Sequence, residues 1–482
     1  MTSQLIIDCG RVSSALLVTA DGQLVPCSQE IRQVATRHVS TGILFDPHVA
    51  ESPDFIWEEA LETLAKATPR NLFQRARRIG LRRPWDAQAV PEALQLASPI
   101  DVLCSAAALA DRNAGALPAV AFALLDALLE PLFAFVAERR IAAIDVEPIV
   151  VLPAHASRAA CVMLEKLFRR RGFRRLTIVR REIAAAMAFV EDAPAEYLVV
   201  DAAGDDVHMH RVSIDGDQPR LFRTRSSTTI AGRGWSYWSG QIAAALNTAA
   251  SSAFERGLLA LLTGSPESLP SRMTYGAVQA ALDEAWTRAR AADVRGALGD
   301  VPDGLPIVFV GEIFTLDAVR KAFGVSRVPG ASVLDHTVRG VALAMRWLHD
   351  GESRQLVIAR GGTLCVDTGR DEAVEILTRA QLPAPGESCH LATDFRVAGD
   401  DSGNVFLLNL LWGADRAPRG NATVCALPIE LCRDAGGNTL RLTVTLRRSR
   451  SGRRLSGTVE ARTAGDVVAA RAQFAEEVEV TR

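Results

Sequence analysis

The sequence lacks paired cysteines: its eight cysteines are scattered, and no two of them are spaced as CxxC. Most of them stand in apolar runs, which is typical of buried free thiols in a reducing compartment. A signal peptide is also missing from the start, because the apolar run Leu5–Ile7 is too short for one. We therefore expect a cytoplasmic protein without structural disulfides.

The sequence also lacks an excess of either charge and a long uninterrupted apolar run. Its formal net charge is −2, which gives no electrostatic reason to expect nucleic acid or an anionic membrane as a partner. The most apolar stretch, Ala116–Val136, is interrupted by Pro118, Asp126, Glu130 and Pro131. These interruptions predict a core helix and no membrane span.

The sequence does contain a repeat in which an apolar strand, an aspartate, a glycine turn and a second strand follow one another. Leu5–Gly10 leads into Ser14–Val18, and Leu198–Gly204 leads into Val207–Val212. Such a turn presents backbone N–H groups to a phosphate, and the aspartate at the strand end can hold a hydrated cation against it. A duplicated half of this kind, with a nucleotide clamped between the halves, is the plan of the actin-like ATPases.

The pattern of predicted secondary structure changes near Asp350. Before it, short apolar strands alternate with helical patterns; after it, short alternating runs are separated by turn signals such as Asp400–Gly403 and Gly436–Asn438. We expect an α/β domain over 1–350, a linker over 351–360 and an all-β sandwich over 361–482. The clearest predicted elements are helices at Trp57–Ala67, Ile183–Val190, 236–262, 276–292, Thr315–Phe323 and Thr337–Leu348, and strands at Ile149–Leu152, Leu176–Val179 and Ile307–Val310.

Short motifs, each of which is weak alone, follow one another over almost the whole length of the chain. These motifs are Asp8–Ser14, Arg70–Gly80, Val151–Ala154, Ala184–Phe189, Asp201–Asp206, Val310–Glu312, Asp335–Gly340, Arg354–Ile358, Leu382-Pro383 and Pro418–Gly420. In the order and spacing of these motifs the chain resembles the DnaK-type chaperones, the 70-kDa heat-shock family.

The resemblance implies an actin-like two-lobed α/β domain of the duplicated ribonuclease H-like kind, followed by a peptide-binding β-sandwich. It also implies ATP or ADP with Mg²⁺, the metal being held near Asp8 and Asp201. The nucleotide-binding residues that it implies are Asp8, Gly10, Arg11, Val12, Asp201, Gly204, Asp205 and Gly311. The chain ends just after the sandwich, so we expect no helical lid.

The departures from the family fall on the chemistry. Arg11 and Val12 replace two hydroxyl residues of the first loop, and Asp205-Asp206 replaces Gly–Thr in the second. The glutamate of the family's E-P-T motif falls on Arg181 or Glu182, and the lysine that orients the attacking water falls on Ala76 or Arg77.

The two added carboxylates carry an electrostatic cost for phosphate binding. A carboxylate about 5 Å from a phosphate charge, at an effective dielectric of about 20, costs about 3 kcal/mol. Two of them weaken ATP binding by about four orders of magnitude, although a bridging Mg²⁺ or Arg11 offsets part of this. The sequence therefore favours a pseudo-ATPase with no catalytic residues, while an active ATPase with a rebuilt phosphate site and a non-catalytic scaffold stay open.

The resemblance places a peptide site in the sandwich. With Gly413 aligned to the glycine that ends the family's central groove strand, Phe406, Leu408 and Leu410 share one face by period two, and Leu391 comes from the preceding strand. The expected partners are unfolded or extended peptide segments, or a specific protein partner. The alternative is that these residues are ordinary sandwich core.

Overall fold

The computed structural model describes residues 2–8, 10, 14–28, 129–156, 158–192, 195–204, 206–216, 220–230, 232–263, 274–282, 305–323, 333–349, 355–359, 363–367, 373–377, 381–397, 405–413, 415, 421–430, 438–451, 454–463, 468–477 and 479–481. The predicted helix Trp57–Ala67, the motif Arg70–Gly80 and the site residues Arg11, Val12 and Asp205 lie outside the described residues. The chain divides into two units: unit 1 comprises 1–212 and 230–352, and unit 2 comprises 213–229 and 353–482.

The first sheet of unit 1 has the strand order β3-β2-β1-β4-β5. Its strands are β1 (Ser3–Asp8), β2 (Ser14–Val18), β3 (Leu24–Pro26), β4 (Val146–Leu152) and β5 (Thr177–Arg180). β1 pairs antiparallel with β2 on one side and parallel with β4 on the other. β1 is buried along its whole length, as expected for a central strand that is apolar without alternation.

The second set of strands in unit 1 repeats this plan. β6 (Ala195–Asp201) lies between β7 (Val207–Asp215) and β9 (Ile307–Val310), and β6 and β9 are parallel. Asp201 at the end of β6 is level with Val310, just as Asp8 at the end of β1 is level with Val151. Each aspartate therefore ends a central strand that has a parallel neighbour on one side and the next strand of the chain on the other.

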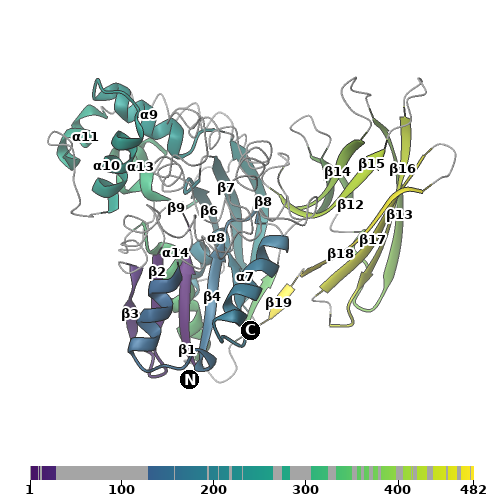
Figure 1. Ribbon diagram of the computed structural model, residues 1–482, viewed down its shortest axis with the longest axis horizontal. Helices are drawn as coiled ribbons and strands as arrows, with labels where there is room; N and C mark the ends of the chain where they lie inside the picture. The colour runs from purple at the N-terminus through teal and green to yellow at the C-terminus, as the bar shows by residue number, and fades with distance from the viewer. Residues whose placement is uncertain are drawn as a thin grey trace, which may run out of the picture. The chain divides into compact units, whose positions relative to one another are not determined.

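Helices pack against each set of strands. Figure 1 shows α9, α10, α11 and α13 gathered beside one another, and a core that includes Trp235, Trp238, Phe254 and Phe314 joins them to β6 and β9. The first sheet shares its core with α7. The helical elements are α7 (Arg158–Arg170), α8 (Arg181–Ala186), η2 (Met187–Phe189), α9 (Trp235–Ala245), α10 (Ser252–Thr263), α11 (Tyr275–Ala281), η3 (Glu312–Thr315), α13 (Asp317–Phe323) and α14 (His336–His349). No helix of the described segments is long and apolar enough to cross a membrane.

Unit 2 contains two sheets that share a hydrophobic core, with the strand orders β12-β11-β14-β15 and β13-β16-β17-β18. Their strands are β11 (Thr363–Asp367), β12 (Ala373–Leu377), β13 (Ser388–Val397), β14 (Val405–Gly413), β15 (Ala422–Glu430), β16 (Asn438–Arg448), β17 (Arg454–Thr463) and β18 (Val468–Glu477). Leu410 of β14 and Leu446 of β16 are completely buried in this core. The core is therefore formed by the facing sides of both sheets.

A further group of strands in unit 2 contains the segment predicted as a linker. Within 351–360, the residues Leu356–Ala359 form β10, which pairs parallel with β8 (Arg220–Ile230) and antiparallel with β19 (Glu479–Thr481). Leu356 and Ile358 are buried. The apolar residues predicted to form a linker therefore form a strand. The two strands that pair with it come from distant parts of the chain.

Two helices of unit 1 approach each other unusually closely at Gly340. A Cβ atom built at this position in α14 lies 2.2 Å from the carbonyl oxygen of Ala184 in α8 and 3.0 Å from the backbone nitrogen of Ala188. Both contacts are with backbone atoms, which cannot swing away as a flexible side chain does. α14 therefore needs a glycine here to pack against α8 and η2.

We expect Gly340→Ala to lower the free energy of unfolding by about 3 kcal/mol, because overpacking forces the helices apart. Chemical denaturation measures the loss. The matched control is Gly276→Ala in α11, where a built Cβ meets nothing within 4 Å; this change should be neutral or stabilise by up to about 1 kcal/mol. Equal effects at the two positions would contradict the packing described here.

Candidate functional site

The centre of the candidate site is the guanidinium of Arg181, which lies between the two aspartates of the repeat. Its Nε and Nη2 donate hydrogen bonds to Asp8 at 2.9–3.3 Å, and its Nη1 donates to Oδ2 of Asp201 at 3.3 Å. All three side chains are buried, with at most 6% of each residue exposed. One positive charge thus bridges two carboxylates in a place that water hardly reaches.

The strands and helices place these three residues without help from long loops. Asp8 ends β1, Asp201 ends β6, and Arg181 is the first residue of α8, directly after β5. The preceding residue, Arg180, donates to the carbonyl oxygens of Pro153 and Ala156, both at 2.9 Å. This anchor fixes the strand-to-helix junction from which Arg181 extends.

The start of α14 completes the surroundings of Asp8. The hydroxyl of Thr337 donates to Oδ2 of Asp8 at 2.7 Å. Ser14 donates to the carbonyl oxygen of Leu334 at 2.6 Å, and Ser28 donates to Oδ1 of Asp335 at 3.1 Å. The motif Asp335–Gly340 is therefore tied to the first sheet by three hydroxyl groups.

The second loop is closed by its own hydrogen bonds. Oδ1 of Asp201 accepts from the backbone N–H of Ala203 at 2.9 Å, and Oδ1 of Asp206 accepts from the N–H of Gly232 at 2.7 Å. Gly311 packs on this loop at a φ of 116°, and a Cβ there would lie 2.7 Å from the nitrogen of Ala203. The structure therefore brings Asp8, Asp201 and Gly311 into one region. In the same loop, the carbonyl oxygen of Gly204 accepts a hydrogen bond from the N–H of Trp235.

A magnesium ion held jointly by Asp8 and Asp201 does not fit this arrangement. Such an ion binds through carboxylate oxygens and its own waters, and the oxygens of both carboxylates that face each other already accept from Arg181. Within the described part of the chain, no group of three or more histidine, cysteine or acidic side chains is arranged to hold a metal ion. The guanidinium stands where the resemblance would put the hydrated cation.

A buried histidine stands next to Thr337. His336 is 2% exposed and its Nε2 is 3.0 Å from the carbonyl oxygen of Ala185. Burial lowers the pKa of His336, and the hydrogen bond to Ala185 opposes the shift only in part. The neutral ring is favoured in the folded state, so this residue contributes no positive charge beside Asp8 at neutral pH.

α10 and η3 bury leucine and glutamate side chains. Leu258 of α10 is completely buried, and Leu259 packs against the same core. Glu255 is buried and its Oε1 accepts from the hydroxyl of Ser239 at 3.2 Å. Glu312 is 1% exposed at the start of η3.

The predicted peptide residues lie in or beside the core of unit 2. Leu410 is completely buried, Leu408 is 7% exposed, and Leu391 of β13 is half-buried against the same core. The side chain of Phe406 is outside the described structure. The burial of Leu408 and Leu410 agrees with the alternative that these residues belong to the sandwich core. Of the predicted peptide residues whose side chains the structure describes, Leu391 is the accessible one.

Sequence comparison adds no relative: neither models of known protein families nor curated protein sequences match this chain.

The sequence marks position 181 only as one of two places for the glutamate of the resembled family, because the bridge joins residues 173 and 20 positions apart. Thr337 is a neighbour of Asp8 that the sequence does not predict, because the two residues are 329 positions apart.

We expect Arg181→Ala to lower the free energy of unfolding by about 3–5 kcal/mol, because two buried carboxylates lose their counter-charge. Mg²⁺ should then raise the melting temperature of the variant and leave that of the wild type unchanged. The control is Arg211→Ala, which removes a half-exposed ion pair with Glu196 and should cost less than about 1 kcal/mol. An Arg181→Ala variant as stable as the wild type would show that the bridge carries no stability.

Proposed function

We propose that this chain is a chaperone-like protein similar to the 70-kDa heat-shock family, with an actin-like front domain over 1–350 and a β-sandwich over 361–482. The front domain acts as a scaffold with a degenerate nucleotide site. The sandwich binds extended peptide segments or a partner protein.

The repeated strand arrangement supports the actin-like part of the proposal. In both halves an aspartate ends a central strand that has a parallel neighbour, and the two aspartates meet at one buried site. Duplicated halves that meet at their phosphate loops are what an actin-like domain requires. The two sheets of unit 2 with a shared core support the sandwich.

The observation that carries the proposal is the bridge from Arg181 to both aspartates. Phosphoryl transfer to water requires a metal ion at the phosphates and a residue that orients the attacking water. Here a guanidinium takes the position of the cation. The requirement for a metal ion at the phosphates is therefore not met while the bridge is in place.

The bridge also acts on the mechanics of the front domain. In a working nucleotide switch, closure of the two halves depends on the phosphates and their metal ion. A guanidinium that belongs to the chain holds Asp8 and Asp201 together whether nucleotide is present or not. The front domain is then locked, and an active ATPase would require Arg181 to leave both carboxylates.

A scaffold that assembles a protein complex is a second candidate function. The specific observation in its favour is the burial of Leu408 and Leu410, which removes two of the four predicted groove residues from contact with a peptide. In this alternative the sandwich recognises a folded partner by its surface. A stable partner that co-purifies with the chain would favour it.

We expect the wild-type protein to show no ATP hydrolysis above background and no measurable heat on titration with ATP or ADP in the presence of Mg²⁺. Phosphate release and calorimetry measure these two quantities. The variant Asp201→Asn is the control for a contaminating ATPase, because it alters the site and leaves a contaminant untouched. Turnover that Asp201→Asn abolishes would refute the degenerate site and restore the active-ATPase alternative.

We expect Leu391→Asp to abolish weak binding of extended apolar peptides to the full-length protein, because a charge replaces the accessible apolar side chain of the set. Weak complexes dissociate rapidly, so fluorescence anisotropy at equilibrium is the suitable measurement. Circular dichroism checks the fold, and Leu410→Asp, in the core, should unfold unit 2 instead. A wild type that binds no peptide at all would favour the scaffold.

A further inference from the structure

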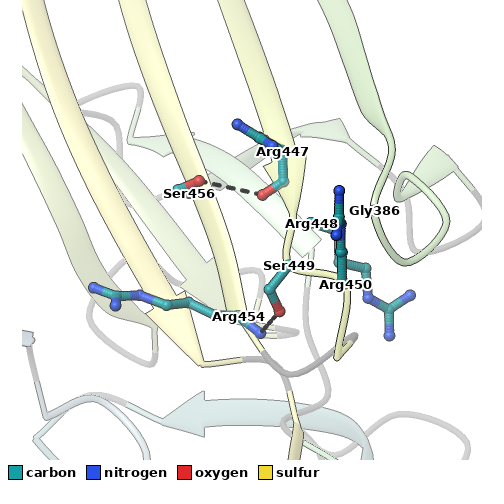
Figure 2. Close-up of a pocket in the computed structure, with 7 residues that line it drawn as sticks. All are labelled: Gly386, Arg447, Arg448, Ser449, Arg450, Arg454 and Ser456. Atoms are coloured by element: carbon teal, nitrogen blue, oxygen red, sulfur yellow. Dashed lines mark hydrogen bonds between the residues drawn. The ribbon is translucent and has the colours of Figure 1, made fainter.

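A pocket of about 250 Å³ opens at one end of the hairpin formed by β16 and β17. Its lining is almost entirely cationic and hydroxylic: Gly386, Arg447, Arg448, Ser449, Arg450, Arg454 and Ser456. No apolar or acidic side chain is among them. Figure 2 shows the arginines spread around the turn of the hairpin, with Arg447 and Arg454 extending from neighbouring strands.

The sequence concentrates positive charge at this turn. Residues 447–454 contain five arginines in eight residues and no acid, in a protein whose net charge is −2. Elsewhere on the same sheet, Arg462 and Arg471 both form ion pairs with Glu460. Arg447, Arg450 and Arg454 form no ion pair with any residue that the structure describes.

The turn that carries these arginines is held in shape by its own hydrogen bonds. The N–H of Arg454 donates to the hydroxyl of Ser449 at 3.0 Å, and the N–H of Ser449 donates to the carbonyl oxygen of Arg454 at 2.8 Å. The hydroxyl of Ser456 donates to the carbonyl oxygen of Arg447 at 3.3 Å. The arginines therefore extend from an ordered hairpin. This order lowers the entropy cost of binding a ligand.

The acidic residue Glu387 follows the pocket residue Gly386 and is exposed. It is not among the described residues that line the pocket. Like charges mounted this close repel one another, and a bound anion removes that cost while it accepts charge-assisted hydrogen bonds from the guanidinium groups.

The arrangement selects a ligand with several separated negative charges. The arginines in Figure 2 fan out around the turn and do not aim at one point, so a single small anion satisfies only part of them. The described residues of the lining include no aromatic side chain on which a base can stack, which disfavours single-stranded nucleic acid. An acidic peptide matches the charge and needs no stacking platform.

An edge strand beside the pocket offers such a peptide a place to extend. β13 begins at Ser388, which is paired with Arg447, and in the described part of the chain β13 has β16 as its one neighbour within the sheet. Its side chains alternate between exposed and half-buried from Ser388 to Phe395. A strand edge of this kind can pair with the backbone of an extended peptide.

We propose that the arginine pocket of the β16–β17 hairpin binds an acidic segment of a partner protein, in extended form, with its carboxylates or phosphorylated side chains on Arg447, Arg450 and Arg454. This deepens the proposed partner binding by unit 2 and names the chemistry of the partner. It does not depend on the apolar residues of the predicted groove.

The test compares a labelled peptide of alternating glutamate and serine with one of alternating glutamine and serine, using the full-length protein and fluorescence anisotropy. The acidic peptide should bind at least about tenfold more tightly, and added salt should weaken it. The triple variant Arg447→Gln, Arg450→Gln, Arg454→Gln should reduce the two peptides to equal affinity. Far-UV circular dichroism should be unchanged, because the three side chains are exposed.

The matched control removes the same number of charges from the same sheet at Arg441, Arg462 and Arg471, each changed to glutamine, and should leave acidic binding within about twofold. Equal affinity for the two peptides in the wild type, or equal loss in both triple variants, overturns the proposal. Tight binding of an oligothymidylate without binding of the acidic peptide assigns the pocket to nucleic acid instead. Binding of apolar peptides is measured separately. A wild type that does not bind the acidic peptide therefore contradicts this proposal alone, and one that does not bind apolar peptides contradicts only the apolar groove.

Discussion

The buried bridge from Arg181 to Asp8 and Asp201 is the interaction on which the rest of unit 1 depends. Asp8 and Asp201 end the central strands of two separate sets, and two carboxylates this deeply buried cannot both stay ionised in one place without a counter-charge. The chain supplies that charge from the first residue of α8. The cost of burying the guanidinium is offset by its bidentate contact with Asp8, which a lysine could not form.

The packing of α14 makes this arrangement rigid. Gly340 allows the helix to lie directly on the backbone of α8, and Thr337, less than one turn earlier, donates to Asp8. Any change in the separation of α8 and α14 would therefore move Arg181 and Thr337 relative to the same carboxylate. Steric contact and charge neutralisation fix the same geometry, which is why neither Gly340 nor Arg181 has a conservative substitute.

Local elements could be predicted from the sequence more fully than the site. The strand Ile307–Val310 and the helix Thr337–Leu348 follow from apolar runs and helical periodicity, and the structure has a strand with these bounds and a helix at His336–His349. The pairing of β10 with β8 could not be foreseen, since register with a strand more than 130 residues away leaves no local signal. Equally, the sequence placed the glutamate of the resembled family on Arg181 or Glu182, but it did not indicate that Arg181 would bridge two carboxylates, because that depends on the meeting of two distant strand ends.

The two proposals share a physical consequence. Where a nucleotide-dependent chaperone changes affinity for its partner by exchanging phosphates and a metal ion, a cation that is part of the chain cannot be exchanged, and the front domain loses that control. Affinity in unit 2 must then be set by the partner itself. An exposed arginine cluster provides such a dependence, because each negative charge added to a partner segment, by sequence or by phosphorylation, strengthens binding. The proposed loss of the nucleotide switch and the proposed binding of an acidic segment by the β16–β17 hairpin are therefore compatible with each other.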